Sequence, residues 1–205
     1  SDGHWVIPPQ YEHVGRLEDP GAACFELRVT KTGDAAVGRI ACVVNGEARY
    51  SEPRQYRCAL GQVCFLRGAT GWQRLDFRSL QVIGPTYAEI GHSWQGQVAV
   101  RLGERWGLLG VSGRMTLPAE YDEVAWLNDP AGAWRAALMV RQGDRRGVVA
   151  PDGNEVLPVR YAAVVRLADD LYAVRVASAW AVVRDGGVRV LRAVLRQEPR
   201  HPPHV

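Results

Sequence analysis

Apolar and polar residues alternate along much of this chain with a period of two, which is the spacing of side chains on one face of a β-strand. In segment 97–102 the apolar residues at even positions would face one side of the strand, and the residues at odd positions, including Arg101, would face the other side. Segment 171–176 repeats this pattern. Residue pairs that favour tight turns separate such segments, namely Asn45-Gly46, Ser112-Gly113 and Asp152-Gly153. The pattern predicts an all-β fold of short antiparallel strands, with no helix longer than about two turns. Segment 188–198 could form a short helix, but we expect a final strand there.

Two independent markers show that the chain is repetitive. The first is a signature that runs from a proline to a tyrosine, and its tyrosines are Tyr11, Tyr56, Tyr87, Tyr121 and Tyr161. Subtracting these positions gives spacings of 45, 31, 34 and 40. The second marker is a tryptophan that enters an apolar run, at Trp72, Trp106 and Trp180, with Arg146 in the corresponding place. Its spacings are 34, 40 and 34.

The two markers agree on a period of 34 to 40 residues. They predict one array over residues 1–195, with about five units of three to four strands each, and a flexible tail at 196–205. The expected units lie near 11–55, 56–86, 87–120, 121–160 and 161–195. We expect the five signature tyrosines at equivalent places in them.

The stretch ERWGLLGVSGRMTLPAEYDEV, residues 104–124, is the clearest copy of the repeat and resembles the bacterial WG repeat family. Trp106-Gly107 is the intact pair, whereas Trp72-Gln73, Arg146-Gly147 and Trp180-Ala181 each depart from it by one residue. The first unit has only Val37-Gly38. This resemblance implies an all-β repeat module, usually without known catalysis.

Each unit is too small to bury both of its faces, so neighbouring units must stack in an open solenoid or form the blades of a propeller. The tryptophans Trp72, Trp106 and Trp180 are expected to pack between units, because an indole buries a large apolar area. The signature prolines are expected to end one strand, with each tyrosine ring covering the next strand.

Composition and charge exclude several classes of protein. The chain has 205 residues, of which 47% are hydrophobic, which suffices for a sizeable core. No apolar run approaches the roughly 18 residues that cross a bilayer, so no membrane insertion is expected. The net charge is only +3 and acidic residues are interspersed with basic ones, so nucleic acid is not an expected partner.

No constellation in the sequence points to catalysis or to a cofactor. His201 and His204 have a spacing that could hold a metal, but no third ligand is near and they lie in the expected tail. The cysteines form no Cys-x-x-Cys pair, and neither Gly-x-Ser-x-Gly nor a phosphate-binding loop occurs. We therefore expect a protein without catalytic residues, bound metal or cofactor.

Five arginines are candidates for binding a partner. Aligning the units on Gly103, Gly143 and Ala177 places Arg101, Arg141 and Arg175 in one column, on the strand face opposite the apolar residues. Arg105 and Arg145 also correspond, next to Trp106 and Arg146. Such a column could bind an acidic protein patch or an anionic polymer. The alternative is a solvated face with no partner.

The four cysteines are candidates for disulfides. Strands at 22–29 and 37–44 on either side of a turn would pair positions whose numbers sum to 66, as Cys24 and Cys42 do. Directly opposed residues of an antiparallel pair lie within disulfide range. Cys58 and Cys64 flank Gly61 symmetrically. Four cysteines allow three pairings, and the alternative is four buried thiols in a reducing cytosol.

Two functions remain open. The first is a non-catalytic binding module that presents a rigid β-surface to a protein partner, in the periplasm or outside the cell if the cysteines are oxidised and a leader was removed before Ser1. The second is a glycan-binding or glycan-processing accessory domain, which the seven tryptophans would favour if they are exposed in a row. A cytoplasmic location remains the alternative if the thiols are free.

Overall fold

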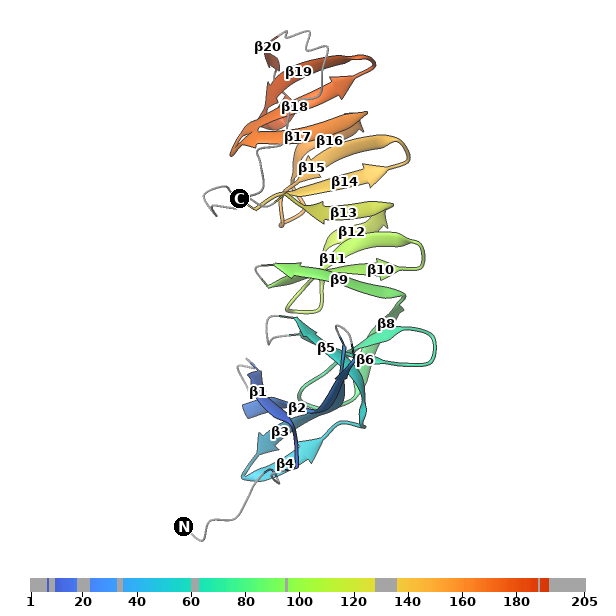
Figure 1. Ribbon diagram of the computed structural model, residues 1–205, viewed down its shortest axis with the longest axis vertical. Coiled ribbons are helices and arrows are strands. Elements are labelled where there is room, and N and C mark those ends of the chain that lie inside the picture. Colours follow the sequence, from blue (N-terminus) through green and yellow to red (C-terminus); the bar gives the residue numbers. More distant parts are fainter. Residues whose placement is uncertain are drawn as a thin grey trace. The chain divides into compact units, whose positions relative to one another are not determined.

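The computed structural model describes residues 7, 10–17, 23–32, 35–59, 63–94, 96–127, 136–187 and 189–191. These residues form an all-β fold of antiparallel strands, as predicted, and no sheet among them closes into a barrel (Figure 1). The one helical element in the described part is a short 3-10 turn at Asp185–Gly187. None of the described helical segments has the length and apolar character needed to cross a membrane. Residues 196–205, the expected flexible tail, lie outside the described part.

The chain divides into two compact units. The first contains residues 1–103 and 109–114, and the second contains residues 104–108 and 115–205. The border between them runs through the sheet of strands β9 (Glu89–Trp94), β10 (Gln97–Leu102), β11 (Arg105–Gly110) and β12 (Met115–Tyr121).

The first and second predicted repeats merge into one sheet in the first unit. Its order is β1-β2-β3-β5-β6-β7-β8, and β4 also pairs with β3. The long strand β3 makes this possible, because it pairs with β4 through 41–44 and with β5 through 36–38. The strands are β1 (His13–Leu17), β2 (Ala23–Thr32), β3 (Ala35–Val44), β4 (Glu47–Tyr50), β5 (Arg54–Ala59), β6 (Val63–Arg67), β7 (Trp72–Leu75) and β8 (Val82–Tyr87).

The later repeats each form a four-stranded sheet (Figure 1). In the second unit, one sheet has the order β13-β14-β15-β16 and the next has the order β17-β18-β19-β20. The expected final strand is present as β20, which is short. The strands are β13 (Glu123–Trp126), β14 (Leu138–Gln142), β15 (Arg145–Val149), β16 (Glu155–Tyr161), β17 (Ala163–Ala168), β18 (Leu171–Val176), β19 (Ala179–Arg184) and β20 (Arg189–Leu191).

Three of the signature prolines lie inside strands rather than ending them, which corrects the prediction from the sequence. Pro85, Pro118 and Pro158 belong to β8, β12 and β16, the last strands of their sheets. A proline has no backbone N–H to donate, so an edge strand tolerates it where a central strand would lose a ladder hydrogen bond. Each of these strands then continues after a single bend residue into the first strand of the next sheet.

Three of the five signature tyrosines occupy equivalent places. Tyr87, Tyr121 and Tyr161 are each the last residue of a strand, directly before the bend. The prediction is wrong for Tyr56, which lies within β5 and pairs with Leu66 and Ala36. Tyr11 lies before the first strand. The N-terminal signature copies thus resemble the later ones in sequence but not in position.

The glycine of the Trp-Gly pair is required by the approach of two strands. A Cβ added at Gly107 would lie 2.6 Å from the carbonyl oxygen of Leu117, and one at Gly147 would lie 2.7 Å from that of Leu157. Leu117 and Leu157 precede the signature prolines, so the backbone of the proline strand passes directly over each glycine. This close approach explains the motif physically.

Successive layers share their cores because single strands have apolar residues on both faces. In β6, Cys64 and Leu66 pack into a cluster with Cys24, Cys42 and neighbouring side chains. Val63 and Phe65, which alternate with them, pack with Trp72, Ile90 and Val98 on the other face. Trp72 therefore packs between repeats, as the sequence predicted. A third cluster joins the last two sheets through Val148, Leu157, Tyr172 and Val174.

Candidate interaction surface

The aligned arginines Arg101, Arg141 and Arg175 occupy equivalent positions in three sheets. In each case the backbone N–H of the bend residue donates to the arginine carbonyl oxygen. The three N···O distances are 2.8 Å for Ala88 to Arg101, 2.8 Å for Asp122 to Arg141 and 2.9 Å for Ala162 to Arg175. The turn that follows each arginine also repeats, with positive φ at Gly103, Gly143 and Ala177. The alignment made from the sequence therefore matches the backbone.

In the third and fourth repeats the aligned arginines are neutralised by carboxylates of the neighbouring strand. Nη2 of Arg101 lies 3.0 Å from Oε2 of Glu89, its cross-strand partner. Nε of Arg141 donates to Oε2 of Glu123 at 3.0 Å, again across one strand pair. Both ion pairs are half-exposed, and such pairs individually contribute little to stability.

Arg105 belongs to the same ionic network. Its guanidinium contacts Oδ1 of Asp122, while Nη1 of Arg141 lies 3.7 Å from Oδ2 of that carboxylate. Oδ2 of Asp122 also accepts a hydrogen bond from the backbone N–H of Gly143, at 2.6 Å. Asp122 thus links Arg105, the first residue of β11, to Gly143 in the turn between β14 and β15.

The remaining two candidates, Arg145 and Arg175, have no acidic partner among the described residues. Nη1 of Arg145 donates to the carbonyl oxygen of Arg160 at 3.4 Å. The guanidinium of Arg175 lies over the ring of Trp180, at 6.0 Å from its centroid. Nε of Arg175 is buried, and no described group forms a hydrogen bond with it.

The tryptophans do not form an exposed row within the described part of the chain. Trp72 and Trp180 are buried, Trp106 and Trp126 are partly buried, and Trp94 is 39% exposed. Trp5 and Trp134 lie outside the described residues. The described aromatic side chains therefore act mainly in packing.

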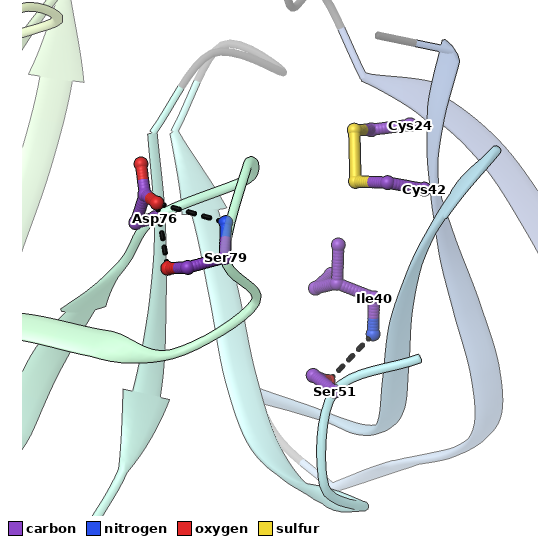
Figure 2. Close-up of a disulfide and its surroundings, with 6 residues drawn as sticks. All are labelled: Cys24, Ile40, Cys42, Ser51, Asp76 and Ser79. Atoms are coloured by element: carbon purple, nitrogen blue, oxygen red, sulfur yellow. Dashed lines mark hydrogen bonds between the residues drawn. A yellow bond between two sulfur atoms is a disulfide. The ribbon is translucent and has the colours of Figure 1, made fainter. Parts of the chain in front are cut away.

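The cysteines form the two disulfides whose register the sequence indicates. Cys24 and Cys42 are cross-strand partners with their Cα atoms 4.0 Å apart (Figure 2). Cys58 and Cys64 are also cross-strand partners and have the same Cα separation. The β2–β3 hairpin is longer than predicted, and a register shift between Arg28 and Thr30 precedes its end. The numbers of paired residues sum to 66 from Ala23 to Arg28, the part of β2 that contains Cys24.

Two polar contacts fix the backbone around the first disulfide (Figure 2). The N–H of Ile40 donates to Oγ of Ser51 at 3.0 Å, and Ser51 itself is buried. The N–H and Oγ of Ser79 both donate to Oδ2 of Asp76, at 2.9 and 2.6 Å. These hydrogen bonds from Ser79 lower the pKa of the Asp76 carboxyl.

Two arginines that donate hydrogen bonds to backbone carbonyl oxygens were not predicted from the sequence. Arg166, with a side chain only 3% exposed, donates to the carbonyl oxygens of Leu127 at 3.1 Å and Asp169 at 2.9 Å. Arg146, which replaces the expected tryptophan, donates to the carbonyl oxygen of Ala162 at 2.7 Å. The placement of Arg166 among apolar positions of segment 163–168 was the available signal.

No described group of three or more His, Cys, Asp or Glu side chains could hold a metal ion. His201 and His204 lie outside the described residues. Cavities occur within each unit, and one in the first unit has a volume of about 480 Å³ and is lined by Tyr11, Arg39 and Tyr50 among others. In the second unit a cavity of about 300 Å³ lies beside Arg160 and Tyr161.

Open antiparallel sheets with equivalent bends, turns and arginine positions define a β-repeat protein. A family model described as the WG containing repeat matches residues 1–27. This match supports the assignment of the chain to the WG repeat family, in agreement with the motif at residues 104–124. No curated protein matches the chain.

Proposed function

We propose that this chain is a non-catalytic repeat module that presents a rigid β-surface to a protein partner in the bacterial cell envelope. The observation that carries the proposal is the periodic placement of arginine side chains on equivalent strands, held by the same backbone hydrogen bond in each sheet. Rigid sheets that display charged groups at fixed intervals suit recognition of a complementary surface, because little side-chain order must be gained on binding.

The two disulfides support a location in an oxidising compartment. Disulfides persist in the periplasm and outside the cell, and are rare in a reducing cytosol. Both bridges lie in the first unit, in the part of the chain where the repeat signature departs most from its later positions. Trapping the thiols with an alkylating reagent in intact source cells, before lysis, tests this location: four blocked thiols contradict it.

Affinity capture with cross-linking, from separate envelope and cytosolic fractions, tests the proposed function. We expect one envelope protein to be enriched, and enrichment to fall when Arg101, Arg141 and Arg175 are all replaced by serine. A matched variant, Arg184→Ser, removes an exposed arginine outside the column and should retain capture. Equal capture by all three proteins, or capture only from cytosol, would contradict the proposal.

The glycan alternative rests on Trp94, the one described tryptophan that is more than a third exposed. A single exposed indole offers one stacking platform, whereas a glycan groove usually needs several aromatic faces. Trp94→Ala should therefore leave protein capture unchanged. Retention of the wild-type chain on an immobilised envelope polysaccharide, lost in Trp94→Ala, would favour the alternative.

A further inference from the structure

The last repeat lacks the carboxylates that pair with the aligned arginine of the preceding repeat. The bend residue and its successor are Asp122 and Glu123 before β14, but Ala162 and Ala163 before β18. The backbone is otherwise the same, since Glu123 faces Arg141 and Ala163 faces Arg175 across their strand pairs. Two negative charges are therefore missing at a position where the positive charges remain.

This loss leaves Arg175 without an acidic residue opposite it on the neighbouring strand. In the fourth repeat, Nε of Arg141 donates to Glu123 at 3.0 Å. The corresponding cross-strand partner of Arg175 is Ala163, and no described carboxylate forms an ion pair with Arg175. The guanidinium charge of Arg175 is therefore available to a carboxylate that a partner supplies.

The side chain of Arg175 is also held in place for binding. Its guanidinium lies over the ring of Trp180, which is buried in β19 as the cross-strand partner of Arg175. Stacking on an aromatic face leaves the edge donors of a guanidinium available to a carboxylate. Arg145, in β15 of the preceding sheet, corresponds to Arg105, which contacts the bend residue Asp122, so this equivalence assigns Arg145 to the bend at Ala162 as a second guanidinium.

We propose that Arg175 and Arg145 bind an acidic segment of a protein partner, whose carboxylates take the positions that Asp122 and Glu123 occupy one repeat earlier. This inference rests on the proposed function and names the chemistry of the partner. The internal model for the ligand is two consecutive acidic residues, Asp122 at the bend and Glu123 at the start of β13, which an Asp-Glu sequence reproduces. A polyuronate spaces its carboxylates by a sugar ring each and lacks that geometry.

A fluorescein-labelled peptide of alternating Asp and Glu residues provides a direct probe, with the matching Asn and Gln peptide as the uncharged control. Fluorescence anisotropy of the whole chain at low salt should detect binding of the acidic peptide only. Binding should weaken by at least about tenfold in Arg175→Ser, because a charge-assisted, partly buried hydrogen bond is lost. The charge-matched variant Arg184→Ser should change the dissociation constant less than about twofold.

A second variant places carboxylates of the chain itself in the proposed site. Ala162→Asp combined with Ala163→Glu restores the acidic pair of the preceding repeat, so it should abolish peptide binding while the thermal unfolding midpoint is kept or raised. This variant separates loss of the site from loss of the fold. Unchanged peptide binding in both Arg175→Ser and the filled variant would overturn the proposal, as would binding of polygalacturonate in place of the peptide.

The capture experiment separates this site from the general function. If Arg175→Ser still captures the envelope protein as well as the wild-type chain does, the acidic-segment site is wrong and the binding module stands. If the peptide binds Arg175 but no protein is captured by the wild-type chain, the site stands and the proposed function is wrong.

Discussion

The backbone of Leu117 passes so close to Gly107 that a side chain at the glycine would lie 2.6 Å from the leucine carbonyl oxygen. The second residue of the Trp-Gly pair must therefore be small because β12 crosses it. Gly107→Ala should lower the free energy of unfolding by about 2–3 kcal/mol, since backbone atoms must shift. Chemical denaturation measures this. Gly68→Ala is the control, because a Cβ there meets only ordinary contacts, and equal losses in both variants would contradict the explanation.

Ala177 adopts the left-handed conformation, with φ of 53°, at a turn where the other sheets have Gly103 and Gly143. This conformation is strained for a residue with a Cβ. Ala177→Gly should raise the free energy of unfolding by about 0.5–1 kcal/mol. The reverse change, Gly143→Ala, should lower it by about 1 kcal/mol, because no atom lies within 4 Å of the added Cβ and only the backbone strain acts. A destabilised Ala177→Gly variant would show that the turn is not strained.

The two disulfides should stabilise the first unit unequally. Their sequence separations are 18 and 6 residues. Loop-closure entropy predicts losses of about 3 kcal/mol for paired serine replacement of Cys24 and Cys42, and about 2 kcal/mol for that of Cys58 and Cys64. Denaturation with and without reductant measures both. Thiol titration of the denatured, unreduced protein made in an oxidising compartment should find no free thiol, and four would contradict the bridges.

The buried Arg166 should contribute far more to stability than an exposed arginine of the same unit. Arg166→Ala leaves the carbonyl oxygens of Leu127 and Asp169 without their donor, so a loss of about 3–5 kcal/mol is expected. Arg184→Ala breaks only an exposed pair with Asp170 and should cost less than about 1 kcal/mol. Thermal unfolding of the two variants compares them directly, and similar midpoints would refute the assigned role.

Alkaline pH should destabilise the protein through its buried tyrosines. Burial raises the pKa of Tyr56 to about 12, with a further contribution from the nearby Glu26 carboxylate. Because the folded pKa lies above the unfolded value of 10.0, the stabilisation is complete below pH 10.0 and is lost as pH rises from 10.0 towards 12. Tyr56→Phe should flatten this part of the pH profile, measured by denaturation at successive pH values.

The same variant has a distinct expectation at neutral pH. The hydroxyl of Tyr56 is buried without a hydrogen-bond partner among the described residues. Removing it deletes an unsatisfied polar group, so Tyr56→Phe should be neutral or slightly stabilising near pH 7. An unchanged alkaline slope in this variant would assign the pH dependence to other groups. Tyr121, whose burial also raises its pKa to about 12, is the next candidate.

The sequence by itself determined the features that depend on local periodicity. Alternation predicted the strands, glycine pairs predicted the hairpins, and the repeat spacing aligned Arg101, Arg141 and Arg175 correctly. The register of Cys24 and Cys42 could be predicted because an antiparallel hairpin keeps a constant sum of paired positions. These properties are set by neighbours along the chain.

Only the tertiary structure decided features that depend on contacts between segments far apart in sequence. The sequence could not show that Pro118 lies in an edge strand, that Tyr56 lies within β5, or that the buried Arg166 donates to the carbonyl oxygen of Leu127. Nor could an aligned column show that Arg141 faces Glu123 and donates to it, whereas Arg175 faces Ala163 and lies over Trp180. Burial and hydrogen-bond satisfaction arise when strands pack, so equivalent positions in the sequence acquire different chemistry in the fold.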